Sequence, residues 1–137
     1  MIDDFLLTKL SAGFLTLFYL FLSFRIGYFR GSPVMKLIFK MDKDISEKKL
    51  ERNVRAHGNF SEYVPIFLIL LFLSEYFDLL NFKYLSILCL IFIYGRLAHA
   101  ICFAFYDYNP FLRISGMIST YLVLLFLSLI LLFKSLI

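Results

Sequence analysis

The sequence predicts an all-α membrane protein built as a bundle of four transmembrane helices. The 137-residue chain is 61% hydrophobic, with 18 Phe and 9 Tyr, and its mean hydropathy of +0.84 is far above that of a soluble domain. In addition, four apolar runs each approach the roughly 20 residues that a helix needs to cross a bilayer. The length suits a single domain, so residues 1–137 are expected to form one four-helix unit.

The first predicted span lies within residues 5–29, FLLTKLSAGFLTLFYLFLSFRIGYF. It is long and lacks a basic start and a small-residue cleavage site, so we expect a mature helix rather than a signal peptide. The other spans cover roughly residues 60–80, 84–106 and 111–133. Cys89 and Cys102 both fall in the third span, where 13 residues of helix separate them by roughly 20 Å. They cannot pair with each other and are expected to be small buried residues.

The loops predict how the chain is oriented in the membrane. The loop after the second span, SEYFDLLNFK, carries only Lys83 as a basic residue, whereas the loop before that span is rich in basic residues. The positive-inside rule places the basic loop in the cytoplasm and both termini on the far side. The loop with Asp107, Asn109 and Arg113 then returns to the cytoplasm. The net charge of +4 is a topology signal, and no nucleic-acid partner is expected. The basic residues of the first loop are Arg30, Lys36, Lys40, Lys43, Lys48, Lys49 and Arg52.

The second transmembrane helix is predicted to begin near residue 47 and to project into the cytoplasm before it enters the membrane. Ser46 is a candidate N-cap. Pro65 is compatible with a continuous helix, because neighbouring helices can satisfy the freed carbonyl. A short amphipathic helix is expected between Pro33 and Glu47. The sequence shows no metal-ligand spacing and no glycine-rich phosphate loop, so no metal site is expected.

Polar residues at the start of this helix share one face. With Arg52 taken as zero, Arg55, Asn59 and Glu62 fall at about −60°, −20° and −80°, within a stripe roughly 80° wide. His57 falls at about 140°, on the opposite side of the helix. The sequence therefore predicts a polar stripe of four residues that excludes His57.

A solvated helix end is the alternative interpretation of this stripe. A Glu51–Arg55 ion pair at i, i+4 contributes about 0.2–0.5 kcal/mol and accounts for the residues near the helix start. It does not account for Asn59 and Glu62, which lie one and two turns further in, just before the apolar run. An ionisable residue at such depth almost always faces a bundle interior or a wet cavity. A binding site and a structural polar network both remain open at this stage.

The third span carries a similar stripe. Arg96, His99, Phe103 and Tyr106 fall at about 0°, −60°, −20° and −80°. A lone histidine in a helix is more often a core residue than a ligand, but an Arg–His–aromatic stripe with a Tyr at its cytoplasmic end is less easily dismissed. Two more arginines lie at span ends, and snorkelling to the interface is their alternative explanation. They are Arg25 in the first span and Arg113 in the fourth.

These residues together indicate an anionic ligand. A surplus of guanidinium groups in a partly dry cleft suits carboxylates, which the arginine fork binds with two hydrogen bonds. A glutamate beside them suits an ammonium group on the same molecule. Glutathione, with two carboxylates, an amine and peptide amides, has this inventory. The candidate set comprises Arg25, Arg52, Arg55, Arg96, Arg113, Asn59, Glu62 and His99.

Two segments resemble a known family. ERNVRAHGNFSEYVP (residues 51–65) is similar to the second-helix signature of MAPEG proteins, the membrane-associated proteins in eicosanoid and glutathione metabolism. GRLAHA (residues 95–100), followed by Arg113 and Gly116, is similar to their other conserved block. The similarity covers essentially the whole chain, and it is greatest to the short bacterial members.

The resemblance implies a homotrimer that binds glutathione at subunit interfaces open to the cytosol. It implies a membrane-bound glutathione transferase in a bacterial inner membrane, with lipophilic electrophiles or lipids as second partners and glutathione-dependent peroxidase activity as a further expectation. Arg113 would stabilise the glutathione thiolate and so be the catalytic residue. By motif position, the residues that would bind glutathione are Arg25, Arg55, Asn59, Glu62, Tyr63, Arg96 and His99.

Two positions depart from the glutathione-using members. Gly58 stands where some carry an arginine, and Phe103 stands where several have a tyrosine, so that a hydroxyl is missing unless Tyr106 or Tyr94 supplies it. The alternative function is therefore a non-catalytic lipid- or glutathione-binding membrane protein of the same family. A transport role would require polar residues through the midplane of the spans, where the sequence has few. A purely structural role leaves Asn59 and Glu62 unexplained.

Overall fold

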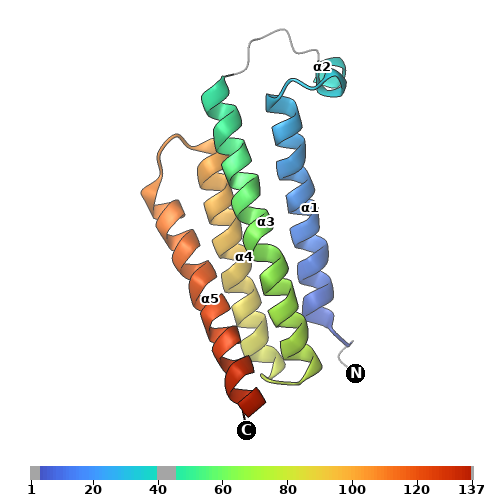
Figure 1. Cartoon of the computed structure of the whole chain (residues 1–137), viewed down its shortest axis with the longest axis vertical. Coiled ribbons are helices and arrows are strands. Elements are labelled where there is room, and N and C mark those ends of the chain that lie inside the picture. Colours follow the sequence, from blue (N-terminus) through green and yellow to red (C-terminus); the bar gives the residue numbers. More distant parts are fainter. Residues whose placement is uncertain (1–3, 40–45, 137) are drawn as a thin grey trace.

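The computed structural model describes residues 4–39 and 46–136, in which four long helices run side by side as a bundle (Figure 1). All four are long and apolar enough to cross a membrane. The predicted fold class is confirmed, and the homotrimer remains a prediction. The helices are α1 (Leu6–Phe29), the short α2 (Pro33–Phe39), α3 (Glu47–Tyr76), α4 (Phe82–Phe105) and α5 (Pro110–Leu136).

The second span differs most from its prediction. The predicted start near residue 47 is confirmed, and α3 continues through Pro65, but it ends at Tyr76 rather than near residue 80. Asp78 adopts a left-handed backbone conformation with φ 49°, and Asn81 then accepts the Tyr84 N–H to cap α4. Ser46 occupies the N-cap position of α3 without a side-chain hydrogen bond to it. The predicted short helix corresponds to α2, whereas Lys40 and Lys43 lie outside the described residues.

The apolar core lies where the long helices meet. The rings of Phe67 and Phe92, both fully buried, stack with 3.8 Å between their centroids and join α3 to α4. Cys89 and Cys102 are buried free cysteines, as predicted. The outer faces are also apolar, with Leu17 70% and Leu90 68% exposed. Large apolar side chains on both the inside and the outside are what a bundle surrounded by acyl chains requires.

Two glycines let α4 and α5 approach each other closely. A Cβ atom on Gly95 would lie 2.9 Å from the Gly116 carbonyl oxygen, and a Cβ atom on Gly116 would lie 2.8 Å from the Gly95 carbonyl oxygen. Small residues are the usual means by which transmembrane helices bring their backbones into contact. The contact also places Gly116 against the backbone of His99.

The N-terminus of α1 is capped from a distant part of the chain. Phe5, the residue before the helix, has a left-handed conformation and provides no side-chain cap. Instead, the carboxylate of Glu75, at the end of α3, accepts the backbone N–H groups of Leu7 at 3.0 Å and Thr8 at 2.8 Å. These donors belong to the first turn, where no intrahelical partner exists. Glu75 therefore joins the start of α1 to the end of α3.

Replacing Glu75 by glutamine leaves one acceptor oxygen for the two N–H groups, and is expected to destabilise this junction by about 0.5–2 kcal/mol. Hydrogen exchange should then be faster at the amides of the first α1 turn. Glu51→Gln is the matched control, because it removes a carboxylate from an exposed ion pair that contributes at most about 1 kcal/mol. Equal exchange in both variants would contradict the capping role of Glu75.

Candidate functional site

A polar cleft opens at the end of the bundle where α3 and α5 begin and α1 and α4 end. It consists of two adjoining cavities of about 450 and 360 Å³ that share Arg52, Phe103 and Asp107. Four cationic side chains but only one acidic side chain line these cavities within the described residues, and the acid, Asp107, also contacts Lys48 at 3.8 Å. The cleft therefore has an excess of positive charge. Its cationic residues are Arg25, Lys49, Arg52 and Arg113.

Two of these arginines lie against the same aromatic ring. The guanidinium carbons of Arg52 and Arg113 are each 5.6 Å from the centroid of Phe103. Cation–π contacts of this kind are attractive and hold the two like charges near each other. The half-buried Phe103 ring thus forms the floor of a site with two guanidinium groups.

The start of α5 determines the position of Arg113. The side chain of Asn109 accepts the backbone N–H of Leu112 at 3.1 Å, and Pro110 occupies the first helical position. An asparagine cap followed by proline is a strong helix-start signal. Arg113 consequently lies in the first turn of α5, exposed at the mouth of the cleft.

Arg52 connects the cleft to the end of α4. Its Nη2 donates to the carbonyl oxygen of Cys102 at 3.0 Å and also to that of Tyr106. The last carbonyls of a helix lack intrahelical partners and carry partial negative charge. Arg52 therefore stabilises the C-terminus of α4 in addition to contributing charge to the cleft.

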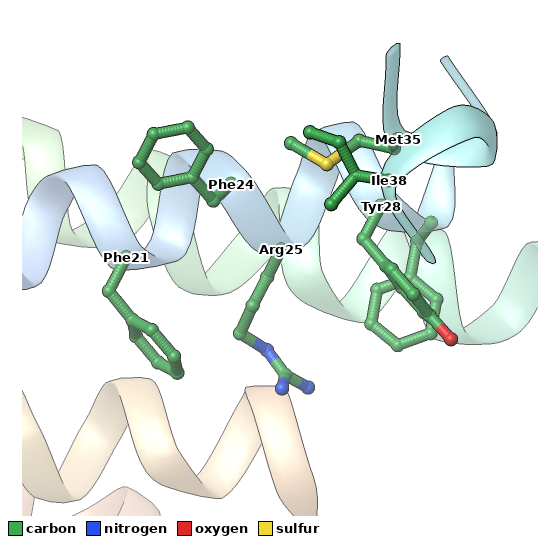
Figure 2. Close-up of a pocket in the computed structure, with 7 residues that line it drawn as sticks. Phe21, Phe24, Arg25, Tyr28, Met35 and Ile38 are labelled. Carbon is green, nitrogen blue, oxygen red and sulfur yellow. The ribbon is translucent and has the colours of Figure 1, made fainter. Parts of the chain in front are cut away.

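Arg25 connects three helices. From α1, its Nε donates to Oδ1 of Asn53 on α3 and its Nη2 to the carbonyl oxygen of Ala104 on α4, both at 2.8 Å. Figure 2 shows the side chain directed away from α2 and toward α4. Its guanidinium carbon lies 4.0 Å from the centroid of the Phe105 ring. Snorkelling does not describe this arginine, because two of its donors are engaged inside the subunit.

Asn53 was missed by the sequence analysis. It is 2% exposed, and its Nδ2 donates to the carbonyl oxygen of Lys49 at 2.7 Å while its Oδ1 holds Arg25. The signal was a polar residue on the buried face of α3, in helical register with Ala56, Phe60 and Val64.

The predicted stripe runs along α3 from Arg52, away from the cleft. Arg55 is exposed and pairs with Glu51 at 2.7 Å, and Glu62 is exposed too. Asn59 is half-buried, and its backbone carbonyl oxygen accepts a hydrogen bond from Arg96 of α4. The stripe thus follows an outer edge of the bundle. On the α1 side of α3, His57 bonds through Nε2 to the Ser23 hydroxyl at 2.8 Å.

Arg96 and His99 lie beneath this edge, inside the bundle. Arg96 is 1% exposed; it donates to the Asn59 carbonyl oxygen at 3.0 Å and to the Thr120 hydroxyl at 3.3 Å. The Tyr63 ring covers the guanidinium at 4.9 Å, and the Tyr63 hydroxyl bonds to that of Tyr121 at 3.0 Å. His99 is 3% exposed and packs on Phe103.

Two atoms of this buried pair have no hydrogen-bond partner within the described residues. They are Nε of Arg96 and Nδ1 of His99. Buried polar atoms in folded proteins usually have a partner, so these two atoms are candidates for contact with a water molecule or a ligand. The structure therefore combines a cationic cleft, a polar outer edge on α3 and an unsatisfied polar pair below that edge.

Tyr106 and Tyr94, either of which could supply the hydroxyl that Phe103 lacks, lie in different places. Tyr106 lines the smaller cavity of the cleft. Tyr94 does not belong to the residues lining either cavity; its hydroxyl bonds to that of Ser115 at 3.1 Å. Tyr106 is the better placed of the two.

Four long apolar helices with an arginine-rich cleft at one end define an integral membrane protein of the polytopic helical class. The model of the MAPEG family matches residues 8–133, so the chain belongs to this family, as the two motifs predicted. The family includes glutathione transferases and related proteins, and its members bind glutathione. A comparison with curated proteins finds no match.

Proposed function

We propose that the protein is a membrane-bound glutathione transferase that acts on lipophilic electrophiles, with glutathione-dependent peroxidase activity on lipid hydroperoxides as a related reaction. The observation that carries this proposal is the pair of guanidinium groups of Arg52 and Arg113 on the Phe103 ring, at the mouth of a cleft with surplus positive charge. Two cations held beside one aromatic ring favour an anion that forms during a reaction.

The donor set fits glutathione. Guanidinium groups bind carboxylates with charge-assisted hydrogen bonds, and the carboxylate of Glu62 suits an ammonium group. The unpartnered Nε of Arg96 and Nδ1 of His99 offer further polar contacts below the α3 edge. Bound here, glutathione would supply a nucleophilic thiol.

Each residue of the proposed site has a distinct task. Arg113 holds the sulfur in its charged form, because a free thiol with a pKa of about 8.5 is mostly protonated at neutral pH. Lowering that pKa by about two units requires about 2.7 kcal/mol of preferential stabilisation, which a charge-assisted contact can provide. The residues that bind and orient the tripeptide are Arg25, Arg55, Asn59, Glu62, Tyr63, Arg96 and His99.

The proposed assembly is a homotrimer. Arg55 and Glu62 are exposed on a single subunit, although they lie on a helix that continues into the membrane. Charged groups at that depth normally face protein or a wet cavity rather than lipid. A neighbouring copy that covers this edge of α3 would close the binding site. The proposed membrane is the bacterial inner membrane, with the cleft open to the cytoplasm.

A non-catalytic binding protein is the second candidate. Phe103 has no hydroxyl, and its ring is already engaged with two arginines. In this case the cleft would hold an anionic ligand without forming a thiolate.

The deciding experiment measures ultraviolet thiolate absorbance when glutathione is added at neutral pH to the purified protein in detergent. We expect a saturable rise in absorbance, and glutathione conjugation to a lipophilic aryl halide in the same preparation. S-methylglutathione, which cannot ionise at sulfur, is the control ligand and should bind without a rise. If calorimetry shows that both ligands bind but glutathione gives no rise in thiolate absorbance, the transferase proposal is wrong and the non-catalytic binding protein is the better description.

A further inference from the structure

A separate apolar cavity lies on the other side of Arg25, between α1 and α2. We call it the α1–α2 pocket; its volume of about 520 Å³ is typical of small-molecule sites. Figure 2 shows Met35 and Ile38 of α2 beside Phe24 and Tyr28 of α1. Arg25 lines this pocket as well, but its guanidinium bonds to α3 and α4. The pocket wall is therefore apolar and suits a hydrocarbon chain.

The outer side of α2 is apolar too. Val34 and Leu37, which do not line the pocket, are 62% and 82% exposed. The helix also follows directly after a membrane-spanning segment. Short amphipathic helices in this position lie in the membrane interface with their apolar side in the acyl-chain region. The α1–α2 pocket then opens at the level where lipid headgroups meet acyl chains.

The charged residues at the end of α1 and in α2 are all basic. Residues 24–39 contain Arg25, Arg30 and Lys36 and no acidic residue. Arg30, directly after α1, and Lys36, in the middle of α2, are both exposed. Because Arg25 is engaged within the bundle, Arg30 and Lys36 are the cations of residues 24–39 that are free to lie at headgroup level. Basic residues next to a membrane attract anionic lipids.

We propose that the α1–α2 pocket binds one acyl chain of an anionic phospholipid whose phosphate lies against Arg30 and Lys36. This lipid site differs from the proposed glutathione site and does not depend on it. The two are nevertheless adjacent, since Arg25 and Phe29 line both the pocket and the polar cleft. A bound chain would support the wall that separates the cleft from the bilayer.

The test uses the full chain in nanodiscs that contain equal amounts of phosphatidylglycerol and phosphatidylcholine with identical acyl chains. Native mass spectrometry then counts the lipids that remain bound to the released protein. We expect preferential retention of phosphatidylglycerol. Lys36→Gln should lower this preference about fivefold, the effect of one basic residue near a lipid surface. Ile38→Trp should lower retention by filling the pocket.

Two control variants test whether the lipid retention depends on this pocket or on any exposed basic or apolar side chain. Lys83→Gln removes an exposed lysine at the opposite end of the bundle, and Leu37→Trp enlarges an exposed α2 side chain that does not line the pocket. Both should retain phosphatidylglycerol as the unaltered chain does. Equal retention of the two lipids by the unaltered chain, or the same loss in the control variants, would overturn the proposal. Displacement of phosphatidylglycerol by oleate at equal concentration would overturn it in favour of a free fatty acid.

Discussion

Replacing Arg113 by alanine is expected to lower turnover of a lipophilic electrophile by about a hundredfold or more, while glutathione affinity changes only slightly. Loss of one group that stabilises charge in the transition state typically costs about 10²–10³ in rate. Arg113 is exposed in the first turn of α5 and lies on the Phe103 ring, so its removal leaves the buried core untouched. The effect should therefore appear in turnover rather than in folding.

Steady-state kinetics and glutathione titrations of the same preparations test this expectation. Arg55→Ala is the contrasting variant, because Arg55 is proposed to bind glutathione; it should raise the KM for glutathione more than it lowers kcat. Arg113→Lys keeps the charge but loses the planar fork and should recover part of the turnover. Equal losses of affinity and turnover in Arg113→Ala would contradict the assignment to the thiolate.

The fold was predictable because lipid imposes a simple rule on each helix. Every span needs about 20 apolar residues, and three of the four predicted spans agree with their helices to within a few residues. The exception is the end of α3, after which Asp78 adopts a left-handed conformation. The cap that Glu75 provides to α1 was not predictable either. That residue is 67 positions from Thr8, whose N–H it accepts, and no local pattern reveals so distant a partner.

The sequence predicted that the polar residues of α3 share one face of the helix, but not which other helices that face would contact. The 3.6-residue period places Arg52 near Asn59. In the structure the Arg52 side chain and the backbone carbonyl of Asn59 both bond to α4. The period does not tell which neighbour each face meets. Arg52 caps the end of α4, and Arg96 is enclosed between Asn59 and Thr120, although the sequence offered both as equivalent cations of one cleft.

The close contact of α4 and α5 leads to the largest expected change in stability. Gly116→Ala would place a methyl group 2.8 Å from the Gly95 carbonyl oxygen and 2.9 Å from the His99 backbone nitrogen. These atoms belong to the backbone, so the two helices must separate. Overpacking of this kind costs about 1–3 kcal/mol and sometimes more. The shift would also move Arg96 and His99, so glutathione binding should weaken together with stability.

Gly13→Ala provides a control of opposite sign. Gly13 lies inside α1, and apart from its own stretch of helix no atom would lie within 4 Å of a Cβ atom at this position. Alanine is favoured over glycine within a helix by up to about 1 kcal/mol. Thermal unfolding in detergent, followed by the loss of the monodisperse size-exclusion peak, should therefore occur at lower temperature for Gly116→Ala and at equal or higher temperature for Gly13→Ala. If the two variants unfold at the same temperature, the backbone contact between α4 and α5 is looser than the structure shows, and Arg96 and His99 are not held in place by it.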